Sequence, residues 1–290
     1  MSALDDNRLV AMARGLRAAG ETRIAPYLTA GDGGLDRTLE LLRAVEGAGA
    51  ACVELGVPFT DPIADGPVLQ AAAARALAAG TTLDGIADTV RAFRAGGGSI
   101  PILAFSYLNP LMGGGVAGGL AARLDQLRGA GFDGLLVPDL PVEEAASLGA
   151  LAEDRGLATV LFCAPTTTDE RLARAAEATR GFLYVVGRTG VTGAATAMSD
   201  DASGYLRRAR ALAGDVPLGV GFGIRTAAQV AAVGEHAELA IVGSALVDAV
   251  HRAADQAAEL AAADAADPTE AAARCAADFI QGLQAPALPS

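Results

Sequence analysis

The sequence predicts an eight-stranded parallel β/α (TIM) barrel, and two observations carry that prediction. Short apolar runs alternate with longer segments of helical period, which is the pattern of repeated strand–helix units. Eight such units occur in a chain of 290 residues, and their close spacing leaves no room for a second domain. We therefore expect a single domain over 1–290, with the barrel at about 20–260 and a helical tail at about 261–290.

The first predicted element is a capped amphipathic helix from Asp6 to about Ala18. Eight buried strands follow, with enough chain after each for one helix: Ile24–Thr29, Ala51–Val57, Pro101–Phe105, Gly134–Val137, Ala158–Phe162, Phe182–Val186, Pro217–Val220 and Leu239–Val242. A last helix, Pro268 to Leu283, is expected to be capped by Asp267 and to pack on the outside of the barrel.

A doubly wound open sheet is the alternative fold. Such a sheet would be expected to carry a glycine-rich dinucleotide or phosphate fingerprint after its first strand. The segment Leu28–Gly34 stands at that place and matches neither fingerprint, so the barrel is favoured.

Charge and composition exclude several classes of function. The net charge of −12 argues against a nucleic-acid or anionic-membrane partner, because both bind a basic face. All 22 basic residues are arginine, so mechanisms that need a lysine amine, such as Schiff-base and pyridoxal phosphate chemistry, are excluded. His236 and His251 both fall on expected outer helices, which argues against a histidine-ligated metal. We expect no cofactor.

The chain has no apolar run of membrane-spanning length, and its first residues lack the pattern of a signal peptide. We expect a cytoplasmic protein. Its three cysteines, Cys52, Cys163 and Cys275, are widely spaced and are interpreted as small core residues rather than as a disulfide or zinc framework.

Two carboxylates in the segment 49–70 are the candidate catalytic residues. Strand alternation places Cys52, Glu54 and Gly56 on one face, so Glu54 points into an interior where burial raises the pKa of its carboxyl group. A group of this kind can act as a general acid and base, and half of a structural ion pair is the alternative interpretation. Asp65 follows in a proline-rich loop, where we expect it to be solvated and ionised, or to cap a helix that begins near Gly66.

Other polar and glycine residues also gather just after the predicted strands, at the end where barrel enzymes keep their active sites. Gly221–Gly223 and Gly243–Ser244 follow the seventh and eighth strands, and together with Gly193 their backbone N–H groups are expected to bind a phosphate without a cationic side chain. Tyr184 either lines the substrate site near Glu54 or is a core tyrosine whose hydroxyl is hydrogen-bonded. The remaining candidates are Tyr107, Asn109, Asp139 as a helix cap, Thr166, Arg188 as a loop anchor, and a closing loop at 189–201.

The segment from Glu54 to Pro67, ELGVPFTDPIADGP, resembles the signature of the tryptophan synthase alpha subunit family, and the likeness extends from about Ile24 to Val250. Further segments match in the same order: 138–144, 188–193, 221–224 and 242–245. The resemblance implies that Glu54 and Asp65 are the catalytic carboxylates. It also implies a substrate site formed by Tyr184, Tyr107, Thr192, Gly193, Phe222, Gly223, Gly243 and Ser244.

The resemblance further implies retro-aldol cleavage of indole-3-glycerol phosphate to indole and glyceraldehyde 3-phosphate, in an α2β2 assembly with a beta subunit. Three alternatives stay open: a stand-alone indole producer, a mainly allosteric partner subunit, and another phosphate-sugar barrel such as an isomerase. Gly33 and the glycine run 113–119 depart from the family pattern, and the run lies where the family contacts its beta subunit.

Overall fold

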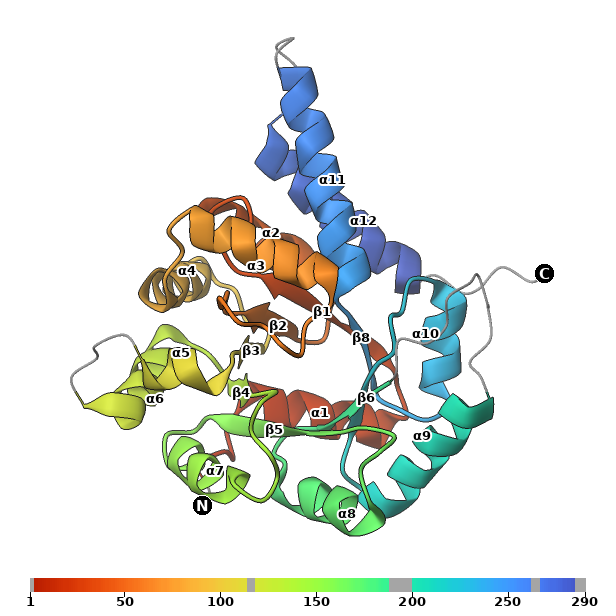
Figure 1. The fold of residues 1–290 in the computed structure, drawn as a ribbon. Coiled ribbons are helices and arrows are strands. Elements are labelled where there is room, and N and C mark those ends of the chain that lie inside the picture. The colour runs from red at the N-terminus through yellow and green to blue at the C-terminus, as the bar shows by residue number, and fades with distance from the viewer. Residues whose placement is uncertain (1–2, 114–117, 188–199, 262–266, 285–290) are drawn as a thin grey trace.

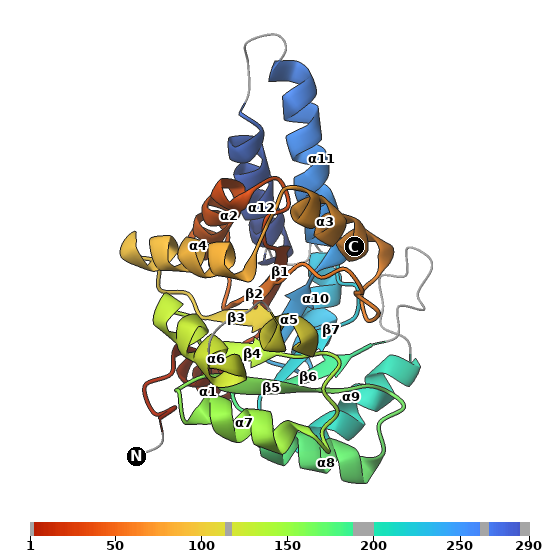
Figure 2. The same cartoon turned by 60° about the vertical axis from the view of Figure 1, so that its left-hand side comes forward.

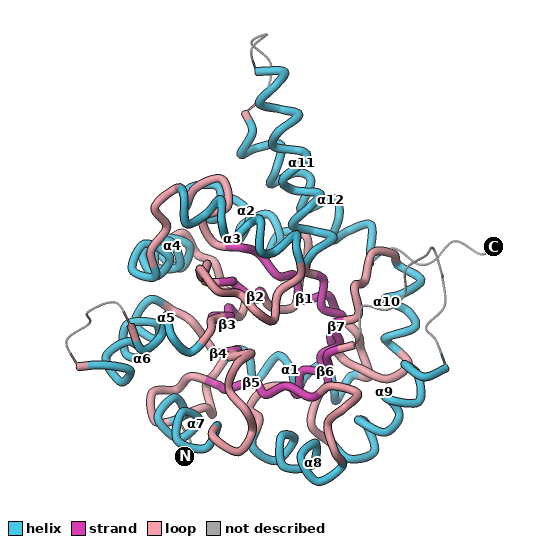
Figure 3. Tube along the Cα trace, in the orientation of Figure 1, coloured by secondary structure: helices cyan, strands magenta, loops and turns pink. Residues whose placement is uncertain are grey.

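A computed structural model describes residues 3–113, 118–187, 200–261 and 267–284 (Figure 1). The strands form a closed parallel barrel in the order β1 to β8, which confirms the predicted fold. Figure 3 shows them as a ring inside a layer of helices. Their bounds are β1 Arg23–Thr29, β2 Val53–Gly56, β3 Ile102–Phe105, β4 Gly134–Leu136, β5 Ala158–Cys163, β6 Leu183–Val186, β7 Leu218–Gly221 and β8 Leu239–Val242.

Alternation along each strand separates two apolar layers, as the sequence predicted. On β2, the side chains of Val53 and Leu55 lie in the cluster between the barrel and its helices. Cys52 lies in the cluster inside the barrel, and Glu54, two residues further on, shares its face. The strand register sets Tyr27 of β1 and Leu103 of β3 beside Glu54.

The helices do not follow the one-per-strand expectation everywhere. Two helices separate β2 from β3, and two separate β3 from β4, because Gly80 and the glycines near 113–119 divide these connections. The helices are α2 Leu35–Gly47, α3 Pro67–Ala78, α4 Leu83–Ala95, α5 Leu108–Met112, α6 Gly119–Ala130, α7 Ala145–Glu153, α8 Asp169–Ala178, α9 Asp200–Ala213 and α10 Ala227–Gly234, besides α1, α11 and α12 below.

The first helix, α1 (Arg8–Ala19), closes the end of the barrel at which the strands begin. Its N-cap is Asn7 rather than Asp6, because the Asn7 side chain accepts hydrogen bonds from two backbone N–H groups of the first turn. Leu9 and Leu16 pack in the inner cluster against residues such as Ala158. The helix is visible through the ring of strands in Figure 3.

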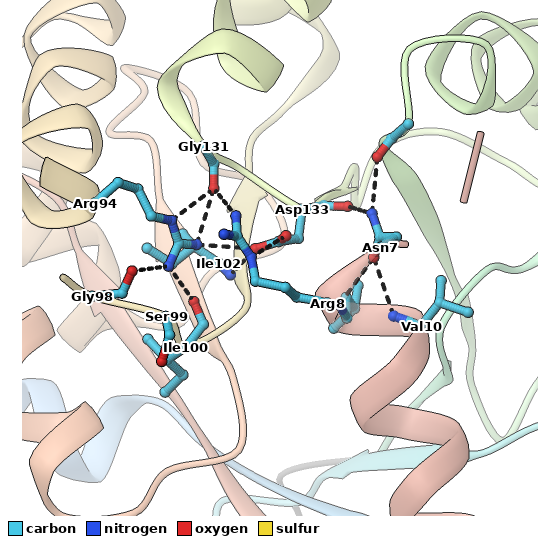
Figure 4. A network of polar contacts seen from close by, with 12 residues as sticks. Asn7, Arg8, Val10, Arg94, Gly98, Ser99, Ile100, Ile102, Gly131 and Asp133 are labelled. Carbon is cyan, nitrogen blue, oxygen red and sulfur yellow. Dashed lines mark hydrogen bonds and ion pairs between the residues drawn. The ribbon is translucent and has the colours of Figure 1, made fainter. Parts of the chain in front are cut away.

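A buried carboxylate fixes this end of the barrel (Figure 4). Asp133, fully buried just before β4, accepts hydrogen bonds from Arg8 at 2.8 Å, Arg94 at 3.0 Å and the Ile102 N–H at 2.9 Å. The Asn7 amide donates to the Asp133 carbonyl at 2.7 Å. Because the charge is paired and its oxygens are occupied, the burial of this ion pair is compensated.

The helices α11 (Ser244–Ala261) and α12 (Pro268–Gln284) pack against each other and extend beyond the barrel (Figures 1 and 2). As predicted, Asp267 caps α12, and its carboxylate accepts a 2.8 Å hydrogen bond from the Thr269 N–H. Ile280 and Leu283 of α12 are buried in the outer cluster, where α12 packs on α2.

Three smaller expectations can also be compared with the structure. All three cysteines are unpaired, and Cys52 and Cys163 are buried as expected. His251 lies on α11 as expected, but His236 lies in the turn after α10 rather than on the helix. Within the described residues, no helix is long and apolar enough to cross a membrane.

Candidate active site

Glu54 is a fully buried acid on the inner face of β2. Neither of its carboxyl oxygens has a hydrogen-bond partner among the described residues. Burial without a partner disfavours the charged form and raises the pKa of Glu54 well above its ordinary value. The alternative interpretation of Glu54 as half of a structural ion pair is therefore wrong.

Aromatic rings surround this acid on the inside of the barrel. Tyr27 meets Phe105 edge to face at 5.4 Å between ring centroids, Phe105 meets Phe162 at 6.1 Å, and Phe162 meets Tyr184 at 4.8 Å. Phe105, Phe162 and Tyr184 are only half-buried, so their faces remain open to the barrel mouth. Tyr184 shares the inner cluster with Phe182, which confirms the predicted face of β6.

Inward-facing glycines make room for the two tyrosines. A β-carbon on Gly56 would lie 2.0 Å from the Tyr27 hydroxyl oxygen, and one on Gly221 would lie 2.9 Å from the Tyr184 hydroxyl oxygen. Burial raises the pKa of Tyr184 well above its usual range, and the negative charge of Glu54 acts in the same direction. Both hydroxyls are therefore neutral hydrogen-bond donors at physiological pH.

Asp65 lies in the loop between β2 and α3, half-buried rather than fully solvated. Burial raises the pKa of Asp65 to about 6, and a hydrogen bond from the Tyr107 hydroxyl acts in the opposite direction. Both candidate carboxylates thus have raised pKa values, whereas we expected only that of Glu54 to be raised. Asp65 is still mostly ionised at pH 7.

The expected helix-capping role of Asp65 is wrong. The N-cap of α3 is Gly66, and no side chain caps it. Tyr107, which follows β3, fixes this loop instead. Its hydroxyl oxygen accepts a 2.9 Å hydrogen bond from the Ala64 N–H, and its ring packs on Phe59 at 5.3 Å between centroids.

Asp139 also differs from its expected role as the cap of the following helix. That helix, α7, begins at Ala145, and its N-cap is Glu144. The Asp139 carboxylate instead accepts from the Leu108 N–H at 3.0 Å, across 31 residues of sequence. It therefore caps α5 and holds the segment that carries Tyr107.

The predicted phosphate-binding segments lie side by side, because β7 and β8 are neighbours in the barrel. Ser244 is the first residue of α11, an 18-residue helix, so Gly243 and Ser244 place backbone N–H groups at a helix N-terminus. Gly223 has a φ of 69°, a conformation that favours glycine. The ring of Phe222 packs directly on Gly187. A β-carbon added to Gly187 would lie 2.0 Å from a carbon of that ring.

Five expectations lie wholly or partly outside the described residues. Thr192, Gly193 and Arg188 fall in the segment 188–199, which also holds most of the predicted loop 189–201. The middle of the glycine run 113–119 also lies outside.

The arrangement supports acid–base chemistry on an aromatic substrate with an anionic end. A buried acid with a raised pKa lies among aromatic side chains inside the barrel, a second carboxylate lies in the loop between β2 and α3, and backbone donors lie at the ends of β7 and β8. No group of three or more His, Cys, Asp or Glu residues within the described ranges is placed to hold a metal ion. Sequence reasoning missed Tyr27. The available signal was its place opposite Glu54 on the neighbouring strand, together with Gly56, which stands two residues after Glu54.

Comparisons with known proteins agree with this geometry. Residues 13–275 match the family of the tryptophan synthase alpha chain. The alpha chain of Alkalilimnicola ehrlichii is 46% identical over 244 residues, or 84% of this chain and 87% of that protein. The alpha chain of Prochlorococcus marinus is 47% identical over 240 residues, covering 82% of this chain and 85% of that protein.

Solved structures give the same result. A chain from a structure of the tryptophan synthase α2β2 complex of the hyperthermophile Pyrococcus furiosus has a TM-score of 0.79 at 34% identity, covering 90% of this chain and 97% of that chain. The alpha chain of Legionella pneumophila has a TM-score of 0.78 at 32% identity, covering 96% and 97%. This chain belongs to the tryptophan synthase alpha chain family.

Proposed function

We propose that this protein is a carbon–carbon lyase that cleaves indole-3-glycerol phosphate to indole and glyceraldehyde 3-phosphate in tryptophan biosynthesis. The observation that carries the proposal is the buried, unpartnered carboxyl group of Glu54 inside an aromatic pocket. An apolar ring fits those walls, and a neutral acid beside it can protonate carbon. Family membership points to the same substrate.

The carbon–carbon bond breaks only if the ring can accept the electron pair. Cleavage without protonation would leave a carbanion on the indole ring, so the ring carbon that bears the side chain must first receive a proton. Glu54 gives that proton, which generates an iminium-like ring. As a carboxylate, Glu54 then takes the proton of the adjacent side-chain hydroxyl while the bond breaks and its electrons return to the ring.

Asp65 has a separate role in this scheme. Its ionised carboxylate accepts the indole N–H and stabilises the positive charge that the protonated ring carries. The N–H groups of Gly223, Gly243 and Ser244 bind the substrate phosphate, and Phe222 covers it. Thr192 and Gly193 are proposed to complete this binding site. Binding at this remote end fixes the ring against Glu54.

The proposed partner is a tryptophan synthase beta subunit in an α2β2 assembly. The Pyrococcus furiosus relative comes from such a complex. Two large apolar side chains support a docking face beside the mouth of the barrel. Ile63 in the Asp65 loop is 84% exposed, and Met112 at the end of α5 is 61% exposed. The cytoplasm, where amino-acid biosynthesis takes place, is the proposed location.

Indole release from indole-3-glycerol phosphate by the purified chain, with and without a beta subunit, tests both proposals. We expect turnover by the isolated chain and faster turnover in the complex. Absence of indole under both conditions would contradict the lyase assignment. Unchanged turnover together with no co-elution of the two chains would contradict the partner assignment alone.

A further inference from the structure

Tyr27 of β1 lies beside Glu54, the proposed general acid, and so can do more than line the pocket. It is the register partner of Glu54 on the neighbouring strand, so the two side chains point into the same interior. Only 7% of Tyr27 is exposed. Its ring leans across β2 and brings the hydroxyl to Gly56, the next inward-facing residue after Glu54.

Gly56 has an ordinary negative φ, so no backbone requirement explains a glycine there. The steric reason is the hydroxyl itself, because a β-carbon at this position would lie 2.0 Å from it. Alternate residues on a strand are about 6.6 Å apart. The Tyr27 hydroxyl therefore lies about one strand repeat from Glu54, a distance that an extended glutamate side chain together with a hydrogen bond can bridge. Both oxygens of Glu54 are without a partner among the described residues.

The same arrangement recurs on the other side of the barrel. Tyr184 is the register partner of Gly219, and its hydroxyl lies over Gly221, again two residues further along the neighbouring strand. Glu54 thus lies between two tyrosines that each lean over a glycine. The resemblance to the family assigns a role to Tyr184, whereas nothing so far assigns one to the Tyr27 hydroxyl.

We propose that Tyr27 is a positioning residue whose hydroxyl donates a hydrogen bond to Glu54 once that group has given up its proton. This inference rests on the acid–base role of Glu54 in the proposed function. In the neutral state Glu54 carries no charge that a donor must compensate, and its oxygens are unpartnered among the described residues. In the ionised state the hydroxyl compensates the buried charge and aims the carboxylate at the substrate hydroxyl that it must deprotonate.

The charged and titratable groups around Tyr27 favour a protonated hydroxyl, which can donate a hydrogen bond. Burial raises the pKa of Tyr27 well above its usual range, and the charges of Asp65 and Glu54 and the nearby Tyr107 act in the same direction, whereas a hydrogen bond with the Thr29 side chain acts in the opposite direction. Tyr184, from β6, faces the same space. The phenol therefore keeps its proton while either carboxylate is ionised.

Tyr27→Phe tests this role, because it keeps the ring and removes only the donor. Loss of a hydrogen bond to a charged group predicts a roughly tenfold to hundredfold fall in kcat, with KM little changed. A bond to the ionised form lowers a pKa, so its loss raises the pKa of Glu54 further. Turnover begins from protonated Glu54, so the alkaline limb of the kcat/KM profile should move to higher pH in the variant.

Tyr205→Phe is the matched control. Tyr205 is equally buried, at 7% exposure, but lies on α9 in the outer cluster. It should leave both the rate and the pH profile unchanged. A purely structural role for Tyr27 would lower activity or thermal stability without moving the alkaline limb, and that result overturns the inference.

Glu54→Gln separates this inference from the proposed function. If Glu54→Gln is inactive while Tyr27→Phe has the wild-type profile, the Tyr27 role is wrong and the lyase mechanism stands. If Glu54→Gln retains turnover, the acid–base assignment fails, and the Tyr27 role fails with it.

Discussion

The hydroxyl oxygen of Tyr107 accepts a 2.9 Å hydrogen bond from the N–H of Ala64, the residue just before Asp65. Tyr107, just after the end of β3, thereby fixes the loop that follows the neighbouring strand β2 and carries the candidate residue Asp65. A hydrogen bond from the same hydroxyl lowers the pKa of the Asp65 carboxyl group, against the larger effect of burial, which raises it.

Tyr107→Phe should therefore move the acid limb of the kcat/KM profile to higher pH. The pKa of Asp65 is about 6, and the Tyr107 bond already lowers it from what burial alone would give. In the proposed mechanism Asp65 acts as a carboxylate, so activity is lost as pH falls through the pKa of Asp65, and loss of the hydrogen bond raises that pKa. An acid limb that stays in place in Tyr107→Phe would show that the hydroxyl does not reach Asp65.

Glu54→Gln should abolish indole release, because an amide neither gives nor takes the required proton. We expect a fall of at least 10²-fold, typical of the removal of a general acid–base group. Binding of glycerol 3-phosphate, measured by calorimetry, should remain close to wild type. Glu143→Gln, at an exposed glutamate paired with Arg171 on the outer surface, is the matched control and should be fully active.

The same Glu54→Gln variant should be more stable than the wild type at neutral pH. In the folded protein Glu54 keeps its proton well above the ordinary pKa of 4.5, whereas in the unfolded chain it releases the proton near that value. Stability of the wild type is therefore lost as pH rises above 4.5, by up to about 1.4 kcal/mol per pH unit. Thermal melts at about pH 4.5 and pH 7 should show a gain only at the higher pH. An equal gain at both would point to packing instead.

Asp133→Ala should destabilise the fold strongly. It would leave the largely buried Arg94 guanidinium without its carboxylate partner and the Ile102 N–H without its acceptor, and removal of one partner of a buried ion pair costs about 3–5 kcal/mol. Urea unfolding measures the loss. Asp88→Ala, which removes an exposed ion pair with Arg91, should cost at most about 1 kcal/mol. Similar losses in the two variants would contradict the importance of the buried network.

Much of the fold follows from local pattern. Strand alternation placed Glu54 inside and Leu55 outside, and the structure agrees at both positions. Leu239–Val242 is recovered to the residue, while each of the other seven strands differs by one or two residues at one or both ends. The paired helices after β2 and β3 were missed, because a glycine break within a helical pattern does not reveal whether one helix or two result.

The sequence named the residues of the candidate site but did not predict their contacts. Asp65 and Asp139 both precede a helical pattern, so a local cap was the natural hypothesis for each. The structure pairs them instead with Tyr107 and Leu108, which lie 42 and 31 residues away in sequence. The half-burial that raises the pKa of Asp65 likewise comes from this tertiary packing, which a linear pattern does not encode.

The helix that closes the far end of the barrel also determines how small molecules travel. Among the described residues, α1 and the Asp133 ion pairs fill that end, so in the proposed reaction an aromatic product formed beside Glu54 would leave by the opposite end of the barrel. Substrate and product would then use the same end. A second protein seated over that end would intercept the product.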